Sequence, residues 1–74
     1  RTRRGTNQAE WVGQALRELG ELDLAQGQTG RGIQHLRDAR EFFVLAGASD
    51  LAPELLAEVD RRLAQAHTLQ RVGR

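Results

Sequence analysis

Apolar residues recur every three or four positions in three segments of this chain, and glycine or proline separates the segments. In the first segment the recurring residues are Trp11, Ala15, Leu19 and Leu22, joined by Val12 and Leu16. In the second they are Ile33, Leu36, Ala39 and Phe43, and in the third they are Leu51, Leu55, Val59 and Leu63. This spacing places apolar side chains on one face of an α-helix, whereas a half-buried strand would alternate with a period of two. The pattern predicts an all-α fold.

The glycines set the expected boundaries of the helices. Gly27 and Gly47 each follow a run of apolar residues and are suited to the left-handed conformation that ends a helix. We therefore expect helices over about 8–26, 30–46 and 50–68, with 1–6 as a disordered or linker arm and 70–74 as a frayed tail.

The residues expected to begin these helices are of the capping type. Thr6 or Asn7 is placed to cap the first helix and Thr29 the second. Ser49 or Asp50 is placed to cap the third helix. Pro53 fits only the first turn of the third helix, where its missing N–H is not needed. The short connections predict an antiparallel helical hairpin within residues 7–69, with the third helix antiparallel to the second.

Composition excludes several classes of protein. The 74 residues include no cysteine, so neither disulfides nor a thiolate metal site holds the fold. No stretch reaches the ~18 unbroken apolar residues of a membrane span, and no signal peptide opens the chain. We expect a cytoplasmic protein and, because the first residue is Arg rather than Met, a piece of a longer polypeptide. A net charge of +1 is too even for a dedicated nucleic-acid domain.

The residues that could carry chemistry have simpler structural interpretations. The hydroxyls of Ser49, Thr29 and Thr68 lie at expected caps or in the tail. His35 has Asp38 three residues further on, but two ligands are too few for a closed metal site. We expect no enzyme activity, no cofactor and no metal, with His35 solvated or at the rim of the core.

Small residues recur where the first two helices must approach each other. Gly20 in mid-helix costs ~1 kcal/mol relative to alanine, which indicates close packing against it. The run that carries this pattern consists of Leu16, Leu19, Gly20, a break near Gly27, Gly32, Leu36 and Ala39. It resembles the tetratricopeptide (TPR) repeat over residues 13–46. The match departs from that pattern at Asp23, where a large aromatic is expected, and a shift of 40 residues places Leu56, Val59 and Leu63 over Leu16, Leu19 and Asp23.

The resemblance implies a TPR-like scaffold that binds a protein or peptide, within a larger bacterial protein such as a transcriptional regulator or signalling ATPase. The first helices of successive repeats would line a concave groove. The residues implied to contact the partner are Gln14, Arg17, Glu21 and Leu24 on the first helix, and Glu54, Ala57 and Arg61 on the third.

Two other functions stay open from the sequence. Trp11 and Val12 belong either to the core or to a contact with an adjacent repeat or a second copy, so the chain could be a self-associating bundle. The arginines near both ends could instead contact phosphates, although Glu58 and Asp60 among them would oppose a nucleic-acid backbone.

Overall fold

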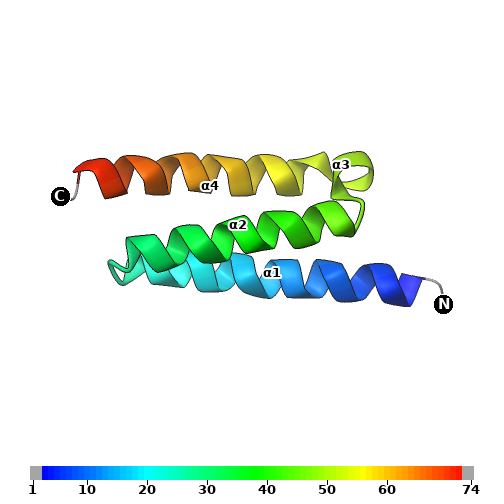
Figure 1. Ribbon diagram of the computed structural model, residues 1–74. Coiled ribbons are helices and arrows are strands. Elements are labelled where there is room, and N and C mark those ends of the chain that lie inside the picture. The colour runs from blue at the N-terminus through cyan, green and yellow to red at the C-terminus, as the bar shows by residue number, and fades with distance from the viewer. Residues whose placement is uncertain (1–2, 73–74) are drawn as a thin grey trace.

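The computed structural model describes the backbone of residues 3–72 and the side chains of residues 8–72. Four helices follow one another: α1 (Arg3–Ala25), α2 (Thr29–Leu45), α3 (Ala48–Leu51) and α4 (Pro53–Val72). No strand occurs in this part of the chain, which confirms the all-α prediction. The three long helices lie side by side, and α2 runs antiparallel to α1 and α4 (Figure 1).

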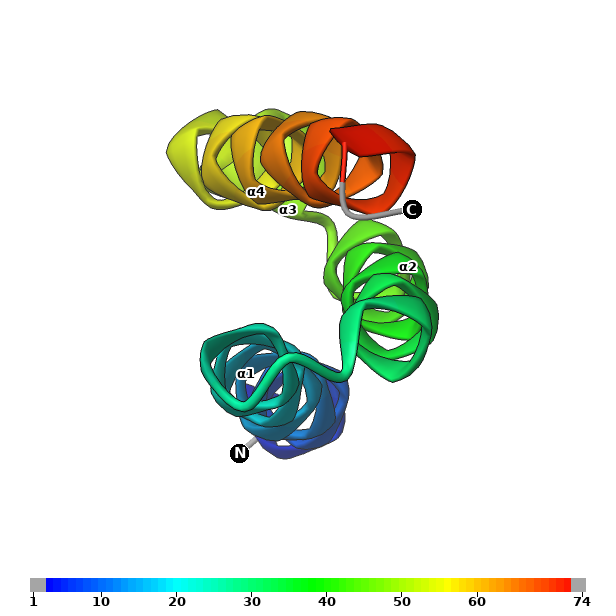
Figure 2. The same cartoon turned by 90° about the vertical axis from the view of Figure 1, so that its left-hand side faces the viewer.

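The second helix is the centre of the arrangement. It packs against α1 on one side and α4 on the other, whereas α1 and α4 barely touch. Seen end-on, the three helices form an open arc with α2 in the middle (Figure 2). The core accordingly gathers on α2, where Leu36, Ala39 and Phe43 are fully buried and contact Val59 of α4.

Glycines end the first two helices as expected. Gly27 and Gly47 both have left-handed backbones, with φ of 81° and 83°. After α1 the amide of Gln28 donates to the carbonyl of Asp23 at 2.7 Å, and that of Gly27 donates to Leu24 at 3.1 Å. These two bonds satisfy carbonyls that the end of the helix leaves free.

Several expected helix boundaries differ from the observed ones. α1 begins at Arg3, so Thr6 and Asn7 lie inside it and do not cap it, and most of the expected arm 1–6 is helical. Arginine is a good helix former and no proline interrupts these residues, which explains the extension. α4 continues to Val72, so residues 70–72 of the expected tail are helical. Residues 1–2 and 73–74 lie outside the described part of the chain.

The expected third helix is divided in two. Ala52, with φ −148° and ψ 65°, separates α3 from α4, because proline disfavours the helical conformation of the residue before it. Pro53 is the first residue of α4, as predicted. Ser49 and Asp50 lie within α3, whose N-cap is Gly47. Thr29 is the first helical residue of α2, after the N-cap Gln28.

The prediction of the buried face of α1 is wrong. Trp11 is 78% exposed and Leu22 53%, and Ala15 and Leu19 are exposed as well. α1 instead turns Gly13, Gly20 and the half-buried Leu16 and Leu24 inward. Glycine has no apolar side chain and does not contribute to a hydrophobic pattern. The pattern therefore predicted burial of the larger apolar residues, which lie on another side of the helix.

Glycines bring the backbones of α1 and α2 close together. A Cβ on Gly20 would lie 2.8 Å from Cγ of Leu36 and 3.1 Å from the carbonyl oxygen of Gly32. A Cβ on Gly32 would lie 3.0 Å from the carbonyl oxygen of Gly20, and one on Gly13 would lie 2.8 Å from the ring of Phe43. The close packing expected at Gly20 is therefore present, with Gly13 as a further contact of the same kind.

Leu36→Ala should lower the free energy of unfolding by about 2–5 kcal/mol, because the truncation leaves a cavity among buried neighbours. Leu45 of the same helix is 74% exposed, and Leu45→Ala should change stability by no more than about 0.5 kcal/mol. Urea unfolding followed by circular dichroism measures both variants. Equal losses would mean that α2 buries a different face.

Gly20→Ala should destabilise the protein by about 1–3 kcal/mol, because the new methyl group overlaps Leu36 and the backbone of α2. Gly30, also helical, has no atom within 4 Å of an added Cβ. Gly30→Ala should therefore stabilise the protein by up to about 1 kcal/mol, which is the gain in helix propensity. Thermal melts of the two variants compare the effects, and stabilisation by both would contradict the close contact.

Candidate functional site

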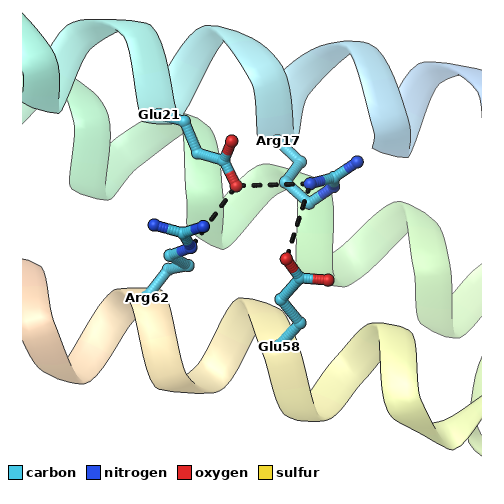
Figure 3. A network of polar contacts seen from close by, with 4 residues as sticks. All are labelled: Arg17, Glu21, Glu58 and Arg62. Atoms are coloured by element: carbon cyan, nitrogen blue, oxygen red, sulfur yellow. Dashed lines mark hydrogen bonds and ion pairs between the residues drawn. The ribbon is translucent and has the colours of Figure 1, made fainter.

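Charged side chains from α1 and α4 meet across the opening of the arc. Nη1 of Arg17 lies 3.2 Å from Oε2 of Glu21 on the same helix and 3.8 Å from Oε2 of Glu58 on α4. Nε of Arg62 on α4 lies 3.4 Å from the same oxygen of Glu21. Figure 3 shows these four side chains linking the two helices in front of α2. We call them the ion-pair network.

Helix geometry explains why these four residues converge. Arg17 and Glu21 are four residues apart on α1, and Glu58 and Arg62 are four apart on α4, so each pair shares one helix face. Positive and negative groups alternate, and each carboxylate contacts at least one guanidinium. Partly exposed pairs of this kind contribute about 0–1 kcal/mol each to stability, so the network positions side chains more than it holds the fold.

One donor of the network lacks a partner. Nε of Arg17 is buried and makes no hydrogen bond among the described atoms. A buried polar atom without a partner costs about 1–3 kcal/mol. The guanidinium of Arg17 would therefore gain from a further acceptor.

Of two depressions in the surface, one includes Glu58 and Arg62 of the ion-pair network in its lining, and the other shares no residue with the network. Toward the N-terminal half of α1 a hollow of about 60 Å³ is lined mainly by apolar side chains. Its lining is Glu10, Phe43, Ala46, Ala48, Leu51, Ala52 and Leu55. Further along α4 a shallow, more polar depression is lined by Glu58, Arg61, Arg62, Ala64, Gln65 and Thr68. We refer to the hollow, the network and this depression together as the groove.

The residues expected to contact a partner are only partly gathered in the groove. Arg17 and Glu21 belong to the ion-pair network, and Gln14 lies on the same face of α1. Leu24 packs inward, and its Cδ2 lies 2.8 Å from the position of a Cβ on Gly32. On α4, Arg61 borders the polar depression. Glu54 and Ala57 are exposed and line neither depression.

The sequence reasoning missed Glu58 and Arg62 as members of the groove. The residues expected on α4 were placed by shifting those of α1 by 40 positions. α4, however, packs Val59 against α2, whereas α1 packs Gly20 there, which is the equivalent of Asp60. The two helices are thus rotated differently about their axes. The 40-residue shift therefore picks out residues of α4 that are next to the groove residues in sequence. The four-residue spacing of Glu58 and Arg62 was the available signal.

A second polar contact joins α1 to α2. Nδ1 of His35 lies 2.6 Å from Oδ2 of Asp23, and the Asp23 residue is only 7% exposed. His35 was expected to be solvated or at the rim, with Asp38 as its neighbour on the helix. Asp38 instead accepts a hydrogen bond from Gln34 at 3.2 Å. The hairpin brings residues 23 and 35 together, which spacing along one helix does not reveal.

The hydroxyl of Thr68 is engaged within α4. The hydroxyl of Thr68 donates to the carbonyl of Ala64 at 3.1 Å. No group of three or more potential metal ligands occurs among the described residues. In the same part of the chain, no helix has the length and apolar character needed to cross a membrane.

Comparison with models of known protein families, with curated proteins and with solved structures finds no match for the chain.

Asp23→Ala and His35→Ala should show a coupling of about 1 kcal/mol or more in a double-mutant cycle, because either change leaves the other group without its partner in a partly buried site. The exposed pair Gln34 and Asp38 is the control, with a coupling of about 0.5 kcal/mol or less. Urea unfolding of the single and double variants gives both values. Equal coupling in the two pairs would rule out a special contribution of the buried contact.

Proposed function

We propose that the chain is a TPR-like helical module that binds a segment of another protein in the groove between α1 and α4. The ion-pair network carries this proposal, since it places alternating charges from two helices across the opening of the arc. The arrangement suits recognition of a polypeptide, whose backbone carbonyls and charged side chains would replace or extend the existing pairs.

The two depressions of the groove favour an extended segment. The hollow next to Phe43 and Leu55 has room for part of one apolar side chain, because it measures only about 60 Å³. The depression near Arg61 and Gln65 offers hydrogen-bond donors. A bound segment would therefore place an apolar side chain near Leu55 and an acidic or carbonyl group near Arg17 or Arg61. Nε of Arg17 would gain an acceptor if the side chain turned toward the segment.

Helix packing supports the TPR-like part of the proposal. Of the residues that carry the resemblance, Gly20, Gly32, Leu36 and Ala39 are buried, whereas Leu19 is 45% exposed. Gly20 and Leu36 meet across the α1–α2 contact. A shift of 40 residues along the chain aligns α1 with α4. α4 runs in the same direction as α1 and packs on α2 (Figure 1). In a larger cytoplasmic bacterial protein, such as a regulator or signalling ATPase, this segment would serve as a scaffold without enzymatic activity.

Ion pairs between arginines and carboxylates argue against the nucleic-acid alternative. Arg17 and Arg62 contact carboxylates within the network, and Nε of Arg40 lies 2.7 Å from Oδ1 of Asp60. Phosphate groups would have to compete with these carboxylates for the guanidinium groups.

Peptide binding to the groove can be tested with a random 12-residue display library, from which peptides that bind the chain are selected. Selected peptides should bind Arg17→Ala and Arg62→Ala at least tenfold more weakly than the parent, as measured by isothermal titration calorimetry. Tenfold corresponds to about 1.4 kcal/mol, which is within the range of one lost charge-assisted hydrogen bond.

Arg37→Ala is the matched control, because Arg37 is an exposed arginine of α2 that lines no part of the groove. Its affinity for the selected peptides should stay within twofold of the parent. A library that yields no binders, or peptides that lose equal affinity to all three variants, would overturn the proposed function. Circular dichroism checks that each variant remains folded.

A further inference from the structure

Five apolar residues lie uncovered along one side of α1. Trp11, Val12, Ala15, Leu19 and Leu22 are all exposed, with Val12 at 42% and Leu19 at 45%. We call them the outer stripe. They recur at helical spacing, so they form one continuous surface. At its N-terminal end, Trp11 and Val12 line a separate shallow depression together with Phe42 of α2. A contiguous apolar surface of this kind marks an interaction site in a folded protein.

α4 shows what covers such a stripe. With the 40-residue offset, Ala15 and Leu19 correspond to Leu55 and Val59. Val59 is fully buried and Leu55 half-buried, and both belong to the core that α4 forms with α2. Two positions that α4 packs against α2 are thus exposed on α1, whereas Leu56 and its equivalent Leu16 both pack against the core.

The residues of α1 that pack on α2 can likewise be compared with their equivalents on α4. α1 packs Gly13 and Gly20 against α2, and their equivalents on α4, Pro53 and Asp60, are exposed. α1 and α4 therefore contact α2 through sides that are rotated relative to each other. On α1 the equivalents of Leu55 and Val59, which are Ala15 and Leu19, are exposed.

We propose that the outer stripe binds an amphipathic helix of a partner protein, antiparallel to α1, in the position that α2 occupies on α4. The partner helix would carry large apolar residues at the spacing of Ile33, Leu36 and Phe43 in α2. Glu18 is exposed at the edge of the outer stripe, and a cationic residue at the border of the partner helix would complement it.

A second copy of the chain fits the outer stripe less well. Antiparallel pairing centred on the stripe would bring the two Glu18 residues within about 5 Å of each other along the helix axis, given a rise of about 1.5 Å per residue. Like charges at this distance oppose pairing.

This proposal is independent of the groove. Arg17 and Glu21 face the ion-pair network, whereas Leu19 and Leu22 are exposed on another side of α1. Loss of groove binding and loss of stripe binding can therefore be told apart with variants of neighbouring residues.

The chain contains one tryptophan, Trp11, so its fluorescence reports directly on the outer stripe. The probe is a capped synthetic peptide of residues 28–46, which has the sequence of α2 and no tryptophan. Titration into the 74-residue chain should shift Trp11 emission to shorter wavelength and reach saturation. Leu19→Lys should weaken this binding at least tenfold, whereas Arg17→Ala should leave it within twofold.

Leu69→Lys is the matched control, because Leu69 is 49% exposed on α4 and Leu19 is 45% exposed on α1. Equal weakening by the two lysine variants, or an emission shift that follows protein concentration alone, would overturn the proposal. In the second case sedimentation would identify another copy as the occupant.

A covalent version removes the dependence on helix formation by a free peptide. Residues 28–52 are fused directly before residue 13, which repeats the α2–α4 connection at the same 40-residue offset and replaces Trp11 and Val12 of the outer stripe by Leu51 and Ala52. Leu19→Ala should then lower the melting temperature of the fused chain by several degrees more than that of the parent, because Leu19 becomes buried. Equal shifts in the two chains would overturn the proposal.

Discussion

The glycine contact between α1 and α2 determines most of the structure. Added Cβ atoms at Gly20 and Gly32 would each come within about 3 Å of the facing backbone, a distance that only glycine permits without a shift. This contact selects the face of α1 that is buried. It also directs Asp23 toward His35 and leaves the outer stripe of α1, with Trp11 at its start, in solvent.

The same contact explains why α1 and α4 are not interchangeable. α1 approaches α2 through glycines, whereas α4 approaches it through larger side chains such as Val59 and Leu55. The helices therefore present different sides to the opening between them. Arg17 and Glu21 from one helix meet Glu58 and Arg62 from the other, and two surfaces of different character result (Figure 3). The ion-pair network is polar and the outer stripe is apolar, and we propose a separate partner for each surface.

Particular residues show where sequence reasoning succeeded. The left-handed conformations of Gly27 and Gly47, the place of Pro53 in a first turn and the burial of Leu36 and Phe43 all follow from local chemistry or from a clear apolar period. Arg17 and Glu21 are four residues apart, which is the spacing of an ion pair within one helix, and their atoms lie 3.2 Å apart. These features depend on residues close in the chain.

The sequence by itself determined that the chain is helical, where glycine and proline interrupt the helices and which face of α2 is buried, because each of these depends on local backbone preferences and one apolar stripe. Only the tertiary structure decided which face of α1 packs inward, because Gly13 and Gly20 carry no hydrophobic signal and act through the backbone of α2. It also decided that Asp23 meets His35 and that Glu58 and Arg62 complete the groove. Those pairings depend on how each helix is rotated against its neighbour, which its own sequence does not specify.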